Sequence, residues 1–155
     1  MRRMLRTRAF LAGILLGVAV MAAIDEIVFH QILGWHHFYD RSTPDIALLS
    51  DGLLHAGELF VAVAGVFLLL DARRREGFRA GAVGCGLLIG AGAFQLFDGL
   101  VDHKVLQVHQ IRYGVELLPY DLAWNAAGAV LLVAGIVATA AVGRREDNAR
   151  TSSRA

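Results

Sequence analysis

Histidine and aspartate recur in this chain with a spacing that suits metal chemistry. The pattern Asp-x4-His-x5-His occurs once in each half, as Asp25, His30 and His36 and again as Asp98, His103 and His109. Imidazole nitrogens together with carboxylate oxygens bind zinc, copper and iron. Carboxylates also orient ligating imidazoles by accepting their other N–H group. The pattern therefore predicts a metal site, provided that the fold brings the two halves together.

The elements that must position these residues are hydrophobic helices. The 155-residue chain is 56% hydrophobic and has a mean hydropathy of +0.53, which is too apolar for an ordinary soluble domain. A helix needs roughly 20 apolar residues to cross a bilayer. Four stretches reach that length, at 10–32, 47–70, 80–102 and 118–142. The sequence therefore predicts an all-α integral membrane protein with four transmembrane helices in a bundle.

Basic residues gather at one end of these helices. Twelve of the 15 Lys and Arg residues flank the ends that carry the chain termini: Arg2, Arg3, Arg6, Arg8, Arg73, Arg74, Arg75, Arg79, Arg144, Arg145, Arg150 and Arg154. The other end has Arg41, Lys104 and Arg112. Because cytoplasmic loops carry the excess of positive charge, we expect both termini in the cytoplasm and all six histidines at the outer end. A net charge of +1 gives no reason to expect a nucleic-acid partner.

The two halves resemble each other beyond the histidines. A shift of 73 residues aligns Gly13 and Gly17 with Gly86 and Gly90, and a shift of 70 aligns the Asp-x3-His at 51–55 with the Asp-x3-Asn at 121–125. We expect two duplicated helical hairpins, 10–71 and 80–142, related by a pseudo-two-fold axis along the membrane normal. A basic segment, 1–9, precedes them, and a polar tail, 143–155, follows and is expected to be disordered.

Helical phase limits which side chains can share one ion. Residues five apart, such as Asp25 and His30, lie about 140° apart around an α-helix. They should therefore not both face one ion. His36 can reach the same place only if the chain turns back after Gly34. We therefore expect ligands from several helices, drawn from one candidate set: His30, His55, His103, His36, His109, Asp51, Asp121, Asp25 and Asp98.

Several longer motifs resemble one bacterial membrane-protein family. They are the segment Asp25–His37, the Asp51-x3-His55 motif, the run Phe97–Lys104 and the segment Tyr120–Asn125. These look like the family catalogued as domain of unknown function 2243, and the resemblance covers about 10 to 142. It implies a four-span bacterial membrane protein with no established activity. We expect the protein in the bacterial inner (plasma) membrane. Members are often encoded beside cytochrome oxidase assembly proteins that deliver copper, so the resemblance also implies such proteins as partners.

The leading functional hypothesis is a transition-metal site, for copper, zinc or iron, at the outer, periplasmic end of the bundle. It would serve metal handling for respiratory oxidase assembly. One alternative is haem-mediated electron transfer, with His30 and His103 as facing axial ligands. A second is a metal-dependent membrane hydrolase with Asp51 or Asp121 as general base. The third is a purely structural network of Asp–His pairs.

Overall fold

The computed structural model describes residues 4–152, and every regular element in that range is helical. The long elements are α1 (Arg8–Ile24), α2 (Pro44–Glu76), α3 (Ala80–Phe97) and α4 (Leu117–Ser152). Short π-helices, η2 (Asp25–Ile32) and η3 (Asp98–Leu106), continue α1 and α3, and a 3-10 turn, η1 (Met4–Arg6), precedes α1. Arg2, Arg3 and Arg154 of the predicted basic clusters lie outside the described residues.

The helix ends follow from local sequence. The Thr7 hydroxyl caps α1 by accepting a hydrogen bond from the Phe10 N–H at 3.2 Å. Thr43 caps α2 in the same way, and Pro44 supplies a first helical residue that needs no N–H partner. At the other end of α2, Gly77 has φ of 75°, a conformation that glycine adopts without steric cost. These signals place the two hairpin turns at opposite ends of the helices.

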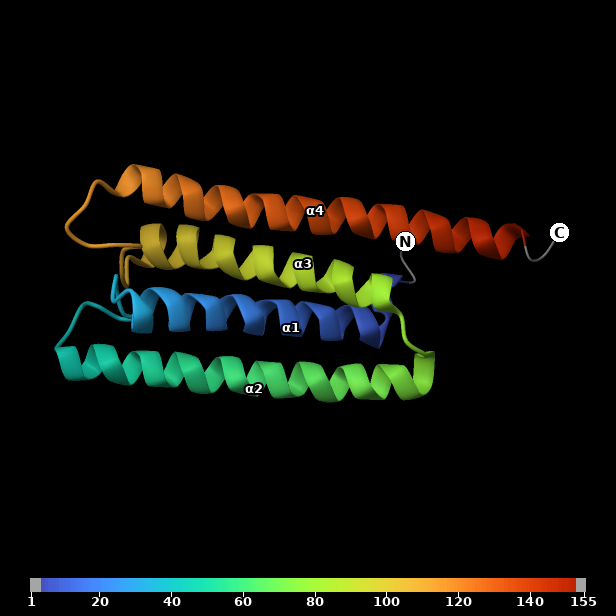
Figure 1. The fold of residues 1–155 in the computed structure, drawn as a ribbon, viewed down its shortest axis with the longest axis horizontal. Coiled ribbons are helices and arrows are strands. Elements are labelled where there is room, and N and C mark those ends of the chain that lie inside the picture. Colours follow the sequence, from blue (N-terminus) through green and yellow to red (C-terminus); the bar gives the residue numbers. More distant parts are fainter. Residues whose placement is uncertain (1–3, 153–155) are drawn as a thin grey trace.

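The four helices lie in a row in the order α2, α1, α3, α4 (Figure 1). The central helices α1 and α3 pack against each other, while α2 packs on α1 and α4 packs on α3. The start of α1 and the C-terminal end of α4 lie at the same end of the helices. The loops 33–43 and 107–116 lie at the other end, where η2 and η3 also terminate. This end carries every histidine of the chain.

Glycines bring the central helices into backbone contact. A Cβ on Gly13 would collide with Val83 O, and a Cβ on Gly86 would collide with Phe10 O. The next pair repeats the arrangement, because Gly17 faces Leu87 O and Gly90 faces Ile14 O. These contacts are reciprocal under the shift of 73 residues, as they would be around a local two-fold axis between α1 and α3. Small residues allow this close approach, which drives helix packing in lipid.

The prediction of four spans is confirmed. Four helical segments are long and apolar enough to cross a membrane: Arg8–Ile32, Pro44–Arg75, Ala80–Leu106 and Leu117–Ala149. The outer helices expose large apolar side chains such as Phe60, Phe67 and Val130, which is what a lipid-facing surface requires.

The tail differs from the expected disorder. Residues 143–152 continue α4 as regular helix. Arg79 tethers this extension to the start of α3 by donating two hydrogen bonds to Glu146, at 2.6 and 2.7 Å. The same nitrogen, Nη2, donates both hydrogen bonds. Charge-assisted hydrogen bonds of this kind are stronger than those between neutral groups.

Candidate metal centre

The helices that carry the histidines change their winding where the Asp-x4-His motif begins. η2 starts at Asp25 and η3 starts at Asp98, and both are π-helices. A π-helix closes hydrogen bonds between residues five apart, so side chains five apart come onto one face. The expectation that Asp25 and His30 point in different directions is therefore wrong. It assumed α-helical winding.

The acid and the first histidine of each motif meet as a result. His30 Nε2 lies 3.6 Å from Asp25 Oδ2, and His103 Nε2 lies 3.2 Å from Asp98 Oδ2. All four side chains are buried, with at most 4% of each exposed. The two halves thus present the same acid–imidazole pair, one from η2 and one from η3.

The second histidine of each motif returns to the pair because the loop reverses. Gly34 has φ of 56°, and Gln107, its counterpart under the 73-residue shift, has φ of 52°. The chain therefore turns back, as the sequence requires for His36 to reach the site. His36 Nε2 lies 4.0 Å from Asp25 Oδ1, and His109 Nε2 lies 3.3 Å from Asp98 Oδ1.

Each returning histidine is held by the loop of the other half. The ring nitrogen His36 Nδ1 lies 2.8 Å from Ile111 O, and His109 Nδ1 lies 2.9 Å from Phe38 O. A carbonyl oxygen only accepts hydrogen bonds, so Nδ1 carries the proton in both rings and donates it. In a neutral imidazole this leaves Nε2 unprotonated, with a lone pair free to bind a cation.

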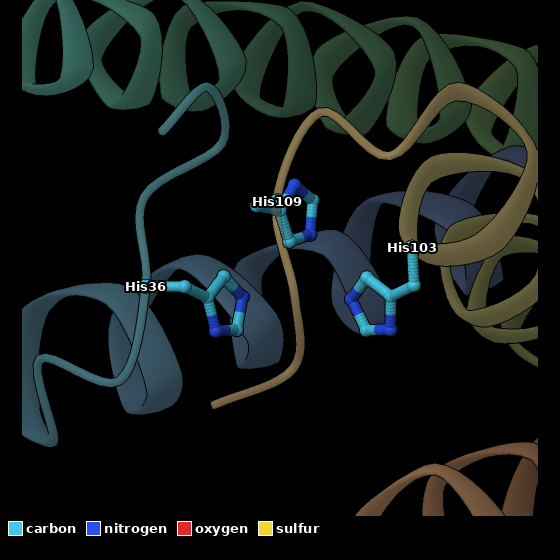
Figure 2. Close-up of side chains that lie close together, drawn as sticks. All are labelled: His36, His103 and His109. Atoms are coloured by element: carbon cyan, nitrogen blue, oxygen red, sulfur yellow. The ribbon is translucent and has the colours of Figure 1, made fainter. Parts of the chain in front are cut away.

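Burial keeps at least one of these rings neutral. It lowers the pKa of His36 to about 2, and the charges of His30, His109 and His103 lower it further. The rings of His36 and His109 are stacked with centroids 4.7 Å apart and planes 3° apart. Figure 2 shows these two loop histidines and His103 converging on one place. The resulting cluster is a compact group of imidazoles that face carboxylates.

The inward nitrogens have no hydrogen-bond partner among the described residues. This holds for Nε2 of all four rings, His30, His36, His103 and His109, and also for Asp98 Oδ2. Buried polar atoms are paired in the great majority of cases, so an unpaired set calls for an explanation. A lone pair facing a carboxylate oxygen is repulsive unless a cation lies between them. The cluster has the composition and spacing of groups that could hold a metal ion, which would relieve that repulsion, as a proton also would.

The spacing of these atoms fits a metal. Two atoms bound to one Zn²⁺ at about 2.1 Å lie at most about 4.2 Å apart. All four Asp-to-Nε2 distances, 3.2 to 4.0 Å, fall within that limit. Three groups offer ligand atoms within 4.8 Å of one another: Asp25, His30 and His36; His36, His103 and His109; and Glu26, His30 and Asp51.

Asp51 orients His30 from outside the cluster. His30 Nδ1 lies 3.1 Å from Asp51 Oδ1, while Nε2 faces Asp25. Asp51 also accepts hydrogen bonds from the Phe38 N–H at 2.8 Å and from the His37 ring at 2.6 Å. Such carboxylate–imidazole pairs fix the tautomer of a ligating histidine and raise its basicity. Asp51, a predicted ligand or hydrogen-bond acceptor, thus lies in the accepting position.

Two other predicted residues lie apart from the cluster. His55 points away and pairs with Glu58, with Nδ1 and Oε1 2.5 Å apart and 46% of the imidazole side chain exposed. Asp121 pairs with the Lys104 ammonium at 2.5 Å, and His103 Nδ1 is 4.0 Å from its other oxygen. His55 therefore does not join His30 and His103 in the cluster. The rings that lie between those two histidines are His36 and His109.

Sequence reasoning missed three contributors to this site. The carbonyls of Phe38 and Ile111 could not be found, because any residue type supplies a carbonyl. Glu26, whose Oε2 lies 2.9 Å from His30 Nδ1, is four residues before that histidine and shares a helix face with it in the sequence, but it was not included in the candidate set.

Comparison with known proteins agrees with this architecture. The profile of the family described as "Predicted membrane protein (DUF2243)" matches residues 12–141. The chain belongs to this family. The match includes the whole histidine cluster and both hairpin halves, so the DUF2243 profile spans the site as well as the helices. Searches of the curated proteins and of the solved structures gave no match.

Proposed function

We propose that this DUF2243 protein binds a divalent transition-metal ion in the cluster of His30, His36, His103 and His109 with Asp25 and Asp98. The observation that carries the proposal is the pair of buried Nε2 atoms of His36 and His109, which have no hydrogen-bond partner among the described residues. Their tautomer is fixed by the carbonyls of the opposite loop. The ligand set has no Cys or Met, which suits zinc, copper(II) or iron(II) better than copper(I).

Charge balance supports the same proposal. Six carboxyl groups are buried: Asp25, Glu26, Asp51, Glu58, Asp98 and Asp102. Within the described part of the chain, none of them forms an ion pair with Lys or Arg. Burying an ionised carboxylate without a countercharge costs several kcal/mol. Histidines are the ionisable groups paired with five of them. A bound metal cation would add positive charge beside Asp25 and Asp98.

The arrangement favours neither haem-mediated electron transfer nor metal-dependent hydrolysis. The rings of His30, His36, His109 and His103 form a continuous series with centroids 4.4, 4.7 and 4.7 Å apart. Two imidazoles thus fill the space in which a porphyrin plane would separate His30 from His103. Hydrolysis would need a free general base. Asp51 accepts from two imidazoles and an amide, and Asp121 is neutralised by Lys104.

The proposed setting is a bacterial inner membrane with both termini in the cytoplasm. Arg73, Arg74 and Arg144 belong to the helix ends opposite to the cluster. An excess of basic residues at that end supports this orientation. The cluster would then face the periplasm. Hand-over of metal to respiratory oxidase assembly proteins is the role suggested by the family resemblance.

Metal analysis of detergent-purified, full-length protein tests the proposal. The informative variant is His36→Asn with His109→Asn, because an amide can still donate to the partner carbonyl but supplies no imidazole ligand. The control is His55→Asn, which alters an exposed histidine outside the cluster. We expect wild type and the control to retain a transition metal, and the double variant to retain at least tenfold less at equal free metal.

Two results would overturn the metal site. One is a wild-type protein that takes up no divalent metal after exposure to Zn²⁺, Co²⁺ or Cu²⁺. The other is a correctly folded double variant with the metal content of wild type. Either result would favour the structural alternative, in which protonated imidazoles and carboxylates hold the helices together.

A further inference from the structure

We infer that divalent metal cations reach the cluster through one side only, by way of a port formed by Glu26, Gln31 and Asp51. This inference rests on the proposed metal centre and adds a second, transient binding site to it. The port lies between η2 and the outer end of α2. Its counterpart in the second half of the chain is closed.

The port is an open pocket next to the buried histidines. It has a volume of about 470 Å³, and its polar lining includes Glu26, Gln31 and Asp51. Glu26 Oε2 is buried and has no hydrogen-bond partner, because the N–H of His30 Nδ1 is taken by Asp51 Oδ1. Gln31 donates to the remaining oxygens, Glu26 Oε1 at 2.8 Å and Asp51 Oδ2 at 3.2 Å. The pocket therefore ends on two carboxylates whose partners among the described residues are amides and imidazoles, with no Lys or Arg.

His30 joins the port to the cluster. Its Nδ1 lies within 3.1 Å of both Glu26 and Asp51, and its Nε2 faces Asp25. Glu26, His30 and Asp51 are also one of the three groups whose ligand atoms lie close enough for an ion. A cation held there would be separated from the cluster by the width of one imidazole ring. Rotation of that ring exchanges ligands from one site to the other.

The second half fills the equivalent place with a cation of its own. Lys104 occupies the position of Gln31 under the 73-residue shift. Its ammonium lies 2.5 Å from Asp121, the counterpart of Asp51, and donates to Gln110 at 3.2 Å. An acidic group that is already neutralised attracts no metal ion. The Lys104 ammonium therefore occupies the position that a metal cation would take in the second half, and so excludes a metal ion from it.

Packing closes the second half as well. Gly99 stands at the position of Glu26, and α4 lies directly against it. A Cβ on Gly99 would be 2.6 Å from Trp124 Cδ1 and 2.6 Å from Asn125 Oδ1. No acidic side chain fits between η3 and α4 at that point. The two halves thus contribute equivalent residues to the cluster, but only the first half leaves a pocket that leads to it.

The test transfers the closing lysine from one half to the other. Full-length, detergent-purified protein is stripped of metal and mixed with Co²⁺, whose visible absorption reports binding. Its initial uptake rate is compared in wild type, Gln31→Lys and the matched control Lys104→Gln. We expect Gln31→Lys to slow uptake about tenfold, because the new ammonium neutralises Asp51. We expect Lys104→Gln to load at least as fast as wild type, with a rate that rises at low salt.

The outcomes separate the port from the metal centre. Uptake by Gln31→Lys at the wild-type rate, or equal slowing in both variants, would overturn the port and leave the centre standing. A wild-type protein that never takes up Co²⁺ would overturn the centre and the port together. A Gln31→Lys protein that keeps the wild-type rate but binds more weakly would show that Glu26 and Asp51 only orient His30, which also overturns the port.

Discussion

A single methyl group added at Gly86 should push the two central helices apart. A Cβ at this position would collide with Phe10 O and lie 2.9 Å from Ile14 N. Both atoms belong to the backbone of α1, so no side-chain rotation relieves the clash. Gly84 lies on the same helix two residues earlier, and a Cβ there meets nothing within 4 Å. Gly84→Ala is therefore the matched control for Gly86→Ala.

The magnitude follows from two opposing effects. Replacing glycine by alanine within a helix stabilises it by about 0.5–1 kcal/mol, and this gain applies to both variants. Overpacking costs about 1–3 kcal/mol, and only Gly86→Ala carries that cost. The free energies of unfolding of the two variants should thus differ by about 1–3 kcal/mol, with Gly84→Ala the more stable.

Unfolding in mixed micelles by increasing dodecyl sulfate measures this difference, with metal content as a second readout. Separation of α1 from α3 also moves His30 and His36 away from His103 and His109, so Gly86→Ala should retain less metal. Equal unfolding free energies, within about 0.5 kcal/mol, would refute the reasoning, because they would mean that α1 and α3 are not in backbone contact.

Two further predictions concern the loops that bring histidines back to the cluster. Gly34→Ala should cost about 1–2 kcal/mol because φ is 56° there, whereas Gln107→Gly should stabilise the protein; reversed signs in detergent unfolding would contradict the turn geometry. The depressed pKa of His36, about 2, means that only the unfolded chain takes up this proton between about pH 6.5 and pH 2. Metal-free wild type should therefore lose about 1 kcal/mol of stability more than His36→Gln between pH 7.5 and 5.5, and parallel pH profiles would show that His36 is not held neutral.

The number of helices and the approximate positions of the spans follow from hydropathy, because a bilayer leaves few ways to satisfy the backbone. The bounds do not, since α2 continues to Glu76 and α4 to Ser152, beyond the apolar stretches. The returning loop was also foreseeable, since His36 can meet Asp25 only if the chain reverses near Gly34. The equivalent turn in the second half, at Gln107, was harder to foresee. Gln107 adopts the same left-handed conformation, which its residue type does not favour.

The winding of η2 and η3 could not be derived from periodicity. Hydrophobic patterns are interpreted with the 3.6-residue repeat, and on that repeat Asp25 and His30 diverge. The spacing itself was the available signal, since an acid five residues before a histidine, occurring twice, suits π-helical winding. His55 was included for a different reason, since it follows Asp51 by one turn of α2, which is a regular α-helix. In the structure its ring pairs with Glu58 and is 46% exposed.

The crossed hydrogen bonds between the loops have a consequence for biogenesis. His36 depends on the carbonyl of Ile111, and His109 depends on that of Phe38, so neither hairpin contains a finished histidine pair. While the chain is being synthesised, the first hairpin can enter the membrane with His36 still unanchored. In the proposed topology, the proposed ligand set is complete only once the second loop has crossed the bilayer. If the centre binds metal as proposed, metal retention would report complete insertion of the chain, and a truncated product would lack the centre.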